Sequence, residues 1–261
     1  MIMYKNLITE NKKGILFITI NREDKLNALN IELLQELKQI VLSVYTDNQI
    51  KGALLTGIGN KAFAAGADIA EFSKFSEQEG VQLSLAGHEI FNSIENCPKP
   101  FIALVNGFCL GGGCELAMAC HMRIATENAK FGQPEVNLGI IPGYGATQRL
   151  VQLIGKAKAL ELLMTADMIK ADEAKALGLV NHVFGSIEDA TVKCEEIITK
   201  IASKGPVAIA KIVECVNAYY DKNQNGFQKE SDIFGWCMTT EDFKEGTTAF
   251  LEKRKANFLG K

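Results

Sequence analysis

The hydrophobic positions of the chain follow two spacings, short apolar runs typical of strands and longer stretches with helical periodicity. Residues 15–20 (ILFITI) form a β-branched run, and residues 101–105 (FIALV) are apolar throughout, as in a strand buried on both faces. In residues 31–46 the apolar side chains recur every three or four positions, and Asn30 precedes them as a predicted N-cap. This pattern predicts a protein in which strands and helices alternate.

The remaining elements continue this alternation. Further strands are predicted at 53–56, 124–125 and 180–184. Further helices are predicted at 77–95, 114–120, 145–166, 172–177, 188–203, 206–220 and 241–256. The small residues at 63–68 (FAAGAD) predict a flexible loop. The predicted organisation is an α/β body over residues 1–190 followed by a helical region over residues 191–261.

Composition and charge narrow the classes of function. The chain has 261 residues, 47% of them hydrophobic, and a formal net charge of −3, which is typical of a soluble globular protein and gives no reason to expect nucleic acid as a partner. The most apolar segment, 100–120, contains Asn106 and Glu115, so we expect a buried element rather than a membrane span. Seven cysteines and no secretory signal predict free thiols in a reducing compartment, and therefore a cytoplasmic protein.

Two glutamates are isolated in apolar surroundings. Glu115 is the only charged residue between Pro100 and Cys120, and Glu135 is the only one between Phe131 and Gln148. A buried carboxylate is costly unless it is hydrogen-bonded or its pKa rises, and a raised pKa suits proton transfer near neutral pH. Each glutamate can instead simply point outward from its element, and the two windows alone favour that interpretation.

Three consecutive glycines, Gly111–Gly113, lie between an apolar strand and a predicted helix. The first turn of a helix leaves backbone N–H groups unpaired, and glycine lets a ligand approach them, so this segment can stabilise an anion. A tight turn with close helix–strand packing explains the same residues equally well. Gly66, in FAAGAD, is a second and weaker candidate for presenting a backbone N–H.

Several familiar catalytic motifs are missing from the sequence. It contains no phosphate-binding G-x-x-x-x-G-K-[ST], no G-x-G-x-x-G after a strand and no G-x-S-x-G. Cys109, Cys114, Cys120 and His121 lack metal-site spacing, and we expect buried structural thiols there.

Six segments resemble the crotonase (enoyl-CoA hydratase) superfamily. They are NREDKLNAL (21–29), KAFAAGADIAEF (61–72), NGFCLGGGCELAMAC (106–120), FGQPEVNLGIIPGYGATQRL (131–150), ADEAKALGLVNHV (171–183) and AFLEKRKANF (249–258). They follow one another at family-like spacing over almost the whole chain, and the two long central blocks are the most specific. The resemblance implies an α/β crotonase (ClpP-like) fold, a spiral of ββα units with a helical C-terminal trimerisation region.

The same resemblance implies an enzyme of fatty acid metabolism. The reaction would be the reversible syn addition of water to a trans-2-enoyl-CoA, in β-oxidation or a fermentative pathway. Glu115 and Glu135 match the catalytic glutamates: Glu135 would protonate the α-carbon, and Glu115 would orient and help deprotonate the water. The N–H groups of Ala67 and Gly112 match the oxyanion hole, which stabilises charge that develops on the thioester oxygen.

Substrate-binding positions also follow from the resemblance. They are Lys25, Leu26, Ala65, Asp68, Ile69, Gly143 and Tyr144. Lys25 and Leu26 lie in a loop expected along the CoA moiety, and Gly143 helps to place the water. Tyr144 is larger than the residue often found there; it either shapes the acyl pocket or contributes to ordinary packing. No metal or redox cofactor is expected, since CoA enters as part of the substrate, and the assembly is expected to be a homotrimer or homohexamer.

Two alternatives remain. A double-bond isomerase on the same scaffold would convert a 3-enoyl-CoA with Glu135 as its main catalytic group. A non-catalytic acyl-CoA-binding subunit would need neither glutamate, so the presence of Glu115, Glu135 and both glycine-containing segments argues against it.

Overall fold

Two β-sheets form the centre of the computed structural model, which describes residues 4–261. The larger sheet has the strand order β1 (Leu7–Lys12), β2 (Ile15–Ile20), β3 (Gly52–Gly57), β5 (Phe101–Val105), β7 (Met122–Thr126) and β10 (His182–Phe184). The smaller sheet has the order β4 (Ala62–Ala65), β6 (Phe108–Leu110), β8 (Lys130–Gly132) and β9 (Ile169–Lys170). Neighbouring strands are parallel except in the pairs β1–β2 and β8–β9.

The chain passes from the larger sheet to the smaller one and then into a helix, and it repeats this path three times. The strand pairs are β3–β4, β5–β6 and β7–β8. The helices that follow them are α2 (Ile69–Phe72) with α3 (Glu77–Glu95), α4 (Gly112–Ala119), and α5 (Ala146–Ile154) with α6 (Lys156–Thr165). This is the spiral of ββα units expected from the sequence.

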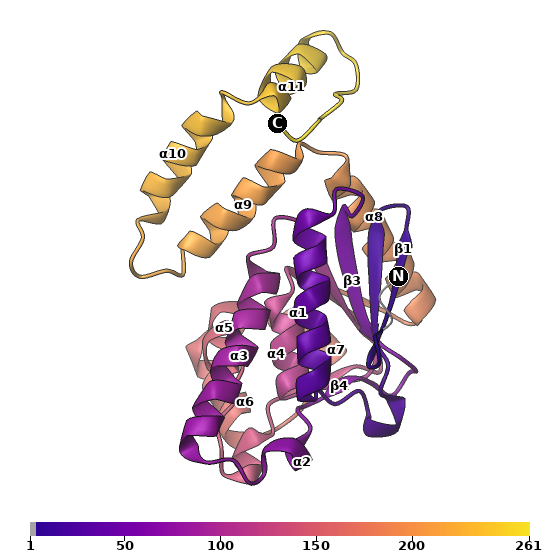
Figure 1. Ribbon diagram of the computed structural model, residues 1–261, viewed down its shortest axis with the longest axis vertical. Coiled ribbons are helices and arrows are strands. Elements are labelled where there is room, and N and C mark those ends of the chain that lie inside the picture. Colours follow the sequence, from indigo (N-terminus) through magenta and orange to yellow (C-terminus); the bar gives the residue numbers. More distant parts are fainter. Residues whose placement is uncertain (1–3) are drawn as a thin grey trace.

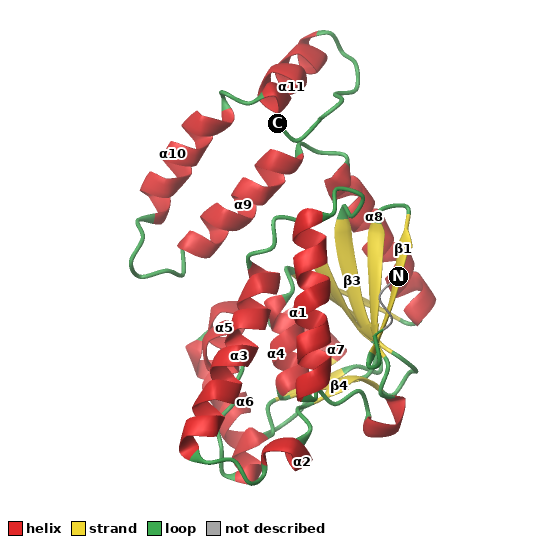
Figure 2. Cartoon of the chain, viewed as in Figure 1, coloured by secondary structure: helices red, strands yellow, loops and turns green. Residues whose placement is uncertain are grey.

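Helices cover both faces of the larger sheet (Figure 2). On one face, α1 (Ile31–Thr46), α3 and α4 enclose the main hydrophobic core. On the other, Cys194 and Ile198 of α8 (Ile187–Ala202) pack with Leu54, Ile102 and Leu104 from the alternate positions of β3 and β5. Every residue of β5 is buried, so the predicted two-sided burial of this strand is confirmed.

Helix starts follow the expected capping chemistry. The Asn30 side chain accepts a hydrogen bond from the N–H of Leu33, so the predicted N-cap of α1 is confirmed. Ser76 and Glu79 form a capping box at the start of α3.

The remaining short helices of the α/β body are η1 (Glu23–Lys25), η2 (Glu135–Leu138) and α7 (Ala171–Ala176).

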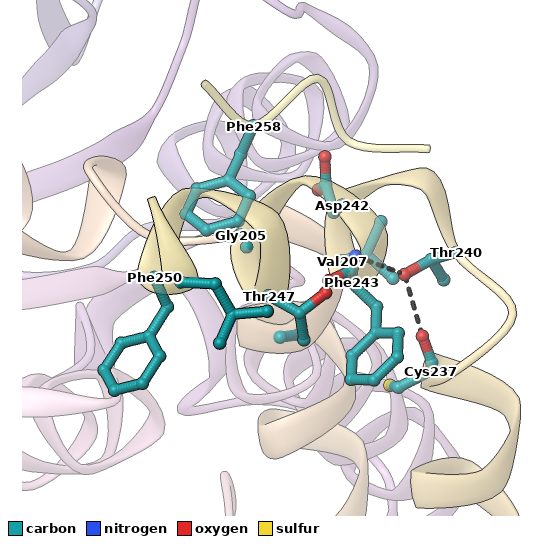
Figure 3. A pocket seen from close by; sticks show the side chains of 12 residues that line it. Gly205, Val207, Cys237, Thr240, Asp242, Phe243, Thr247, Phe250 and Phe258 are labelled. Carbon is teal, nitrogen blue, oxygen red and sulfur yellow. Dashed lines mark hydrogen bonds between the residues drawn. The ribbon is translucent and has the colours of Figure 1, made fainter. Parts of the chain in front are cut away.

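Three C-terminal helices extend away from the α/β body: α9 (Pro206–Ala218), α10 (Gly226–Cys237) and α11 (Glu241–Leu251) (Figure 1). An apolar hollow of about 500 Å³ lies against α11 and the start of α9, and Phe243, Phe250 and Phe258 are among its lining residues (Figure 3). The predicted domain boundary at residue 190 falls within α8, which packs on the larger sheet; that boundary remains a prediction.

Some predicted elements were wrong. The predicted loop at 63–68 begins as strand β4, because small buried residues pair there with β6. The single helix predicted at 145–166 is two helices separated by Gly155, whose φ of 79° is incompatible with a helix. The helix predicted to reach residue 256 ends at Leu251. Among residues 4–261, no helix is long and apolar enough to cross a lipid bilayer.

Candidate active site

A cavity of about 370 Å³ lies where β4, α3, α4 and the segment 134–144 meet. It brings together most of the predicted site residues. Those that line it are Ala65, Ala67, Ile69, Gly112, Glu115, Glu135, Gly143 and Tyr144. Residues far apart in sequence therefore share one cavity because consecutive turns of the spiral place them side by side.

Glycines at the junction of β6 and α4 allow close contacts with other parts of the chain. Gly111 has a φ of 47°, and a Cβ added there would lie 2.6 Å from Oε1 of Glu135. Gly113 packs directly on the carbonyl of Ala64, so any side chain there would collide with β4. The predicted tight packing of this segment is confirmed at Gly113, and stabilisation of an anion by the segment stays a prediction.

Two backbone N–H groups lie close together at the wall of the cavity. A Cβ added at Gly112 would lie 3.5 Å from the nitrogen of Ala67. Gly112 is the first residue of α4, where N–H groups have no intrahelical acceptor and the helix dipole favours negative charge. Within residues 4–261, neither N–H donates to a protein acceptor. Both are therefore free to bind an anionic oxygen of a ligand.

Glu115 projects from α4 and is only 1% exposed. Its Oε1 accepts hydrogen bonds from the N–H groups of Tyr144 (2.8 Å) and Ala146 (2.9 Å). Burial raises the pKa of the Glu115 carboxyl above its ordinary value, and those N–H groups and the charge of Arg149 oppose the rise. The outward-facing alternative is therefore wrong for Glu115.

Glu135 begins η2 and is half-buried at the cavity wall. Burial raises the pKa of its carboxyl to about 7, and the nearby Glu115 carboxylate contributes to that rise. With its nitrogen facing Glu135, the buried amide of Gln133 donates to Oε2 at 3.1 Å and to Oε1 at 3.2 Å. A carboxyl group with this pKa can donate or accept a proton near neutral pH.

Tyr144 forms one side of the cavity and is 6% exposed. Its ring packs edge-on against Phe91, with ring centroids 5.5 Å apart, and occupies a space left by Gly87, where any side chain would collide with it. Tyr144 thus lines the cavity and packs into the core at once, so both interpretations of this residue apply.

Three predicted binding residues do not line the cavity. Lys25 and Leu26 lie at the end of η1 and are exposed, although the carbonyl of Leu26 accepts a hydrogen bond from the N–H of Ala65. Asp68 forms an ion pair with Arg22 at 3.0 Å. A role for these side chains in CoA binding stays a prediction.

The sequence did not identify several residues that shape the site. Gln133, two positions before Glu135, contacts its carboxyl group, and Ser84 donates to the carbonyl of Gly143 at 2.6 Å. The side chains of Phe72, Phe75 and Leu83 add apolar lining. Gln133 was detectable because it stands in the same uncharged window as Glu135, whereas the others lie in ordinary amphipathic stretches.

The predicted thiols are confirmed: Cys109, Cys114 and Cys120 are free and buried. In the part of the chain that the structure describes, no group of three or more His, Cys, Asp or Glu side chains is placed to hold a metal ion.

The site has the parts needed for proton transfer next to a developing oxyanion. Two carboxyl groups with raised pKa values and two free N–H groups face one partly apolar cavity. An oxyanion bound at those N–H groups would be stabilised by donors that need no reorganisation, and removing one such donor typically costs about 10²–10³ in rate.

The sequence and the structure of the chain are both similar to those of one family of known proteins. A family model described as enoyl-CoA hydratase/isomerase matches residues 10–261. The chain is similar to a crotonyl-CoA hydratase of Syntrophomonas wolfei, with 47% identity over 99% of both chains, and to a short-chain-enoyl-CoA hydratase of Clostridium acetobutylicum, with 45% identity over 96% of both. The crystal structure of an enoyl-CoA hydratase from Bacillus anthracis has a TM-score of 0.91 and 38% identity, covering 98% of this chain and 100% of that one.

The raised pKa of Glu135 makes stability depend on pH. A carboxyl group whose folded pKa is about 7 stabilises the fold fully below its ordinary pKa of 4.5 and loses that contribution as pH rises through 7. E135Q stays neutral, so we expect it to gain stability over the wild type by about 1–2 kcal/mol between pH 4.5 and pH 8, after allowing for partial exposure.

Urea unfolding at several pH values measures this difference. The control is E89Q, which changes an exposed carboxylate of α3. A constant difference between E135Q and wild type across the pH range would contradict the burial of Glu135.

Proposed function

This chain belongs to the enoyl-CoA hydratase/isomerase family, and from that membership and its site we infer that it is an enoyl-CoA hydratase acting on short-chain trans-2-enoyl-CoA thioesters. The single observation that carries the inference is the convergence of Glu115, Glu135 and two free N–H groups on one cavity. Relatives that are 47% and 45% identical over nearly their whole length, named crotonyl-CoA hydratase and short-chain-enoyl-CoA hydratase, support the substrate class.

In the proposed reaction the oxygen of a water molecule bonds to C3 of the enoyl group and a proton is added to C2. Electron density moves to the thioester oxygen, where the N–H groups of Ala67 and Gly112 stabilise it. Glu115 takes a proton from the attacking water, and Glu135 delivers a proton to C2. Glu115 gains one proton and Glu135 loses one, so the net charge of the pair does not change, and proton exchange with solvent returns each glutamate to its first state.

The position of Glu115 supports hydration rather than double-bond isomerisation as the activity of this protein. A double-bond isomerase needs one carboxyl group to move a proton between two carbons, whereas hydration also requires a group that orients water. Glu115 has one oxygen bound by two backbone N–H groups, so its carboxyl group is held in a fixed direction at the cavity. A fixed second carboxyl is what water addition requires.

Water addition is redox-neutral, and the two glutamates supply its proton transfers. We therefore propose that the enzyme uses no metal or redox cofactor, with CoA entering as part of the substrate. Free cysteines, five of them buried, are compatible with work in a reducing compartment, and we propose the cytoplasm as its location.

Purified protein mixed with crotonyl-CoA is expected to remove the ultraviolet absorbance of the conjugated enoyl thioester. E115Q and E135Q should each lower kcat by about 10²–10⁴ while the protein stays folded, because each removes a proton-transfer group. A series of enoyl-CoA substrates from four carbons upward measures the preferred chain length. Binding of these thioesters without hydration of any of them, or a fully active single variant, would contradict the proposal.

The C-terminal helices expose an unusually large apolar surface. Phe227 is 87% exposed, Phe250 is 82% exposed, and Leu251 and Tyr219 are each 79% exposed. Large exposed apolar surfaces mark protein contacts. We propose that α9, α10 and α11 bind a second copy of this chain and that the assembly is a homotrimer or a dimer of trimers.

Sedimentation velocity at micromolar concentration tests the assembly. The wild type is expected to sediment as a trimer or hexamer, and F250E should shift it to smaller species because a charge replaces buried apolar contact. F250L keeps the apolar surface and is the matched control. A monomeric wild type would contradict the proposed assembly.

A further inference from the structure

Arg149 is a buried cation just outside the candidate active site. It lies on α5 and is 5% exposed. Its guanidinium donates through Nε and Nη2 to Oε2 of Glu95, at 3.1 and 2.8 Å, and Nη2 also donates to Oδ1 of Asn92. Glu95 and Asn92 belong to the last turn of α3, so Arg149 ties α5 to α3.

The remaining contact of Arg149 reaches the segment that holds Glu115. Nη1 donates to the carbonyl of Tyr144 at 3.1 Å. The N–H of the same residue donates to Glu115, as does the N–H of Ala146. One short backbone segment is thus bound by Arg149 on one side and binds Glu115 on the other.

Gly145, between these two N–H groups, has a conformation that fits this arrangement. Its φ of 115° is rarely adopted by residues with a side chain, and a Cβ there would collide with Nη1 of Arg149. Ser84 of α3 holds the same segment at a second point through the carbonyl of Gly143. The backbone conformation and the guanidinium are therefore matched to each other.

We propose that Arg149 is a positioning residue for hydration: by clamping segment 143–146 to Glu95 and Asn92 of α3, it fixes the two N–H groups that aim the Glu115 carboxyl group into the cavity. This deepens the proposed function and rests on it for the kinetic readout. Arg149 does not line the cavity, so it acts on Glu115 through the segment that it holds and through its charge.

The burial of the Arg149–Glu95 ion pair indicates that Arg149 does more than stabilise the fold. Burying an ion pair costs desolvation energy that is often only just repaid, so apolar residues would stabilise this junction equally well. An apolar side chain could not hold the Tyr144 carbonyl. Displacing a catalytic group by about 1 Å can cost about 10²-fold in rate, so orientation is the property that the clamp supplies.

The charge of Arg149 has a second effect that can be measured separately, a change in the pKa of Glu115. The groups that interact with the Glu115 carboxyl are Arg149 on α5, Glu135 on η2 and Tyr144 in the segment itself. His88 and Glu95 on α3 lie beside Arg149. The positive charge of Arg149 lowers the pKa of Glu115, against the rise caused by burial. Glu95 neutralises part of that charge. Loss of Arg149 and loss of the Glu95 charge therefore move this pKa in opposite directions.

The kinetic test compares R149M, R149K and E95Q. R149M should lower kcat about 10–100-fold with KM within about threefold of the wild type. Because Glu115 acts ionised in hydration, the acid limb of kcat/KM should move to higher pH in R149M and to lower pH in E95Q. R149K keeps the positive charge but lacks the planar guanidinium group that binds several partners at once. It should therefore lower kcat without shifting the acid limb of the kcat/KM profile. E89Q, an exposed change on α3, is the matched control and should match the wild type.

Hydrogen exchange tests the clamp without any substrate. The amides of segment 143–148 should exchange at least about tenfold faster in R149M than in the wild type or in E89Q, because their anchoring carbonyl is released. Unchanged exchange there, or unchanged kcat and acid limb in a folded R149M, would overturn the proposal. If R149M fails to fold, an unchanged kcat in a folded R149K, or an acid limb of E95Q that does not move to lower pH, would overturn it. A wild type that hydrates no enoyl-CoA refutes the proposed function instead, and the exchange measurement still tests the clamp.

Discussion

The close approach of α4 to β4 is the constraint on which the rest of the site depends. Gly113 rests on the carbonyl of Ala64, and Gly112 comes near the nitrogen of Ala67, so two backbone segments touch without side chains between them. This contact brings two unpaired N–H groups together and directs Glu115 from α4 toward the cavity. A side chain at Gly113 would collide with Ala64 and push the two segments apart, and so disturb the proposed oxyanion site.

Burial then gives this arrangement its chemistry. Glu115 is enclosed, with one oxygen held by two N–H groups, and Glu135 is half-buried and lines the same cavity. Loss of hydration raises the pKa of both carboxyl groups, and it brings the pKa of Glu135 to about 7, where proton transfer occurs near neutral pH. Two similar side chains thereby lie in different environments, and the different roles proposed for them follow from that difference.

Local pattern was enough to predict many of the regular elements, and it singled out Glu115 and Glu135 because their surroundings have no other charge. Pattern alone favoured outward-facing side chains, and only the family resemblance assigned the two glutamates to a site. Strands such as β6 and β8 were not predicted because they are only three residues long and become strands by pairing with distant segments. The role of Arg149 was invisible for the same reason: its partners on α3 are more than fifty residues away.

A crystal structure with a non-reactive acyl-CoA tests the central claim most directly, since it locates the thioester group against the two N–H groups and the two glutamates. We expect the thioester oxygen at about 2.7–3.1 Å from the nitrogens of both Ala67 and Gly112, with C2 and C3 of the acyl chain between the carboxyl groups of Glu115 and Glu135. A thioester oxygen bound elsewhere, or an acyl chain that reaches neither glutamate, would contradict it.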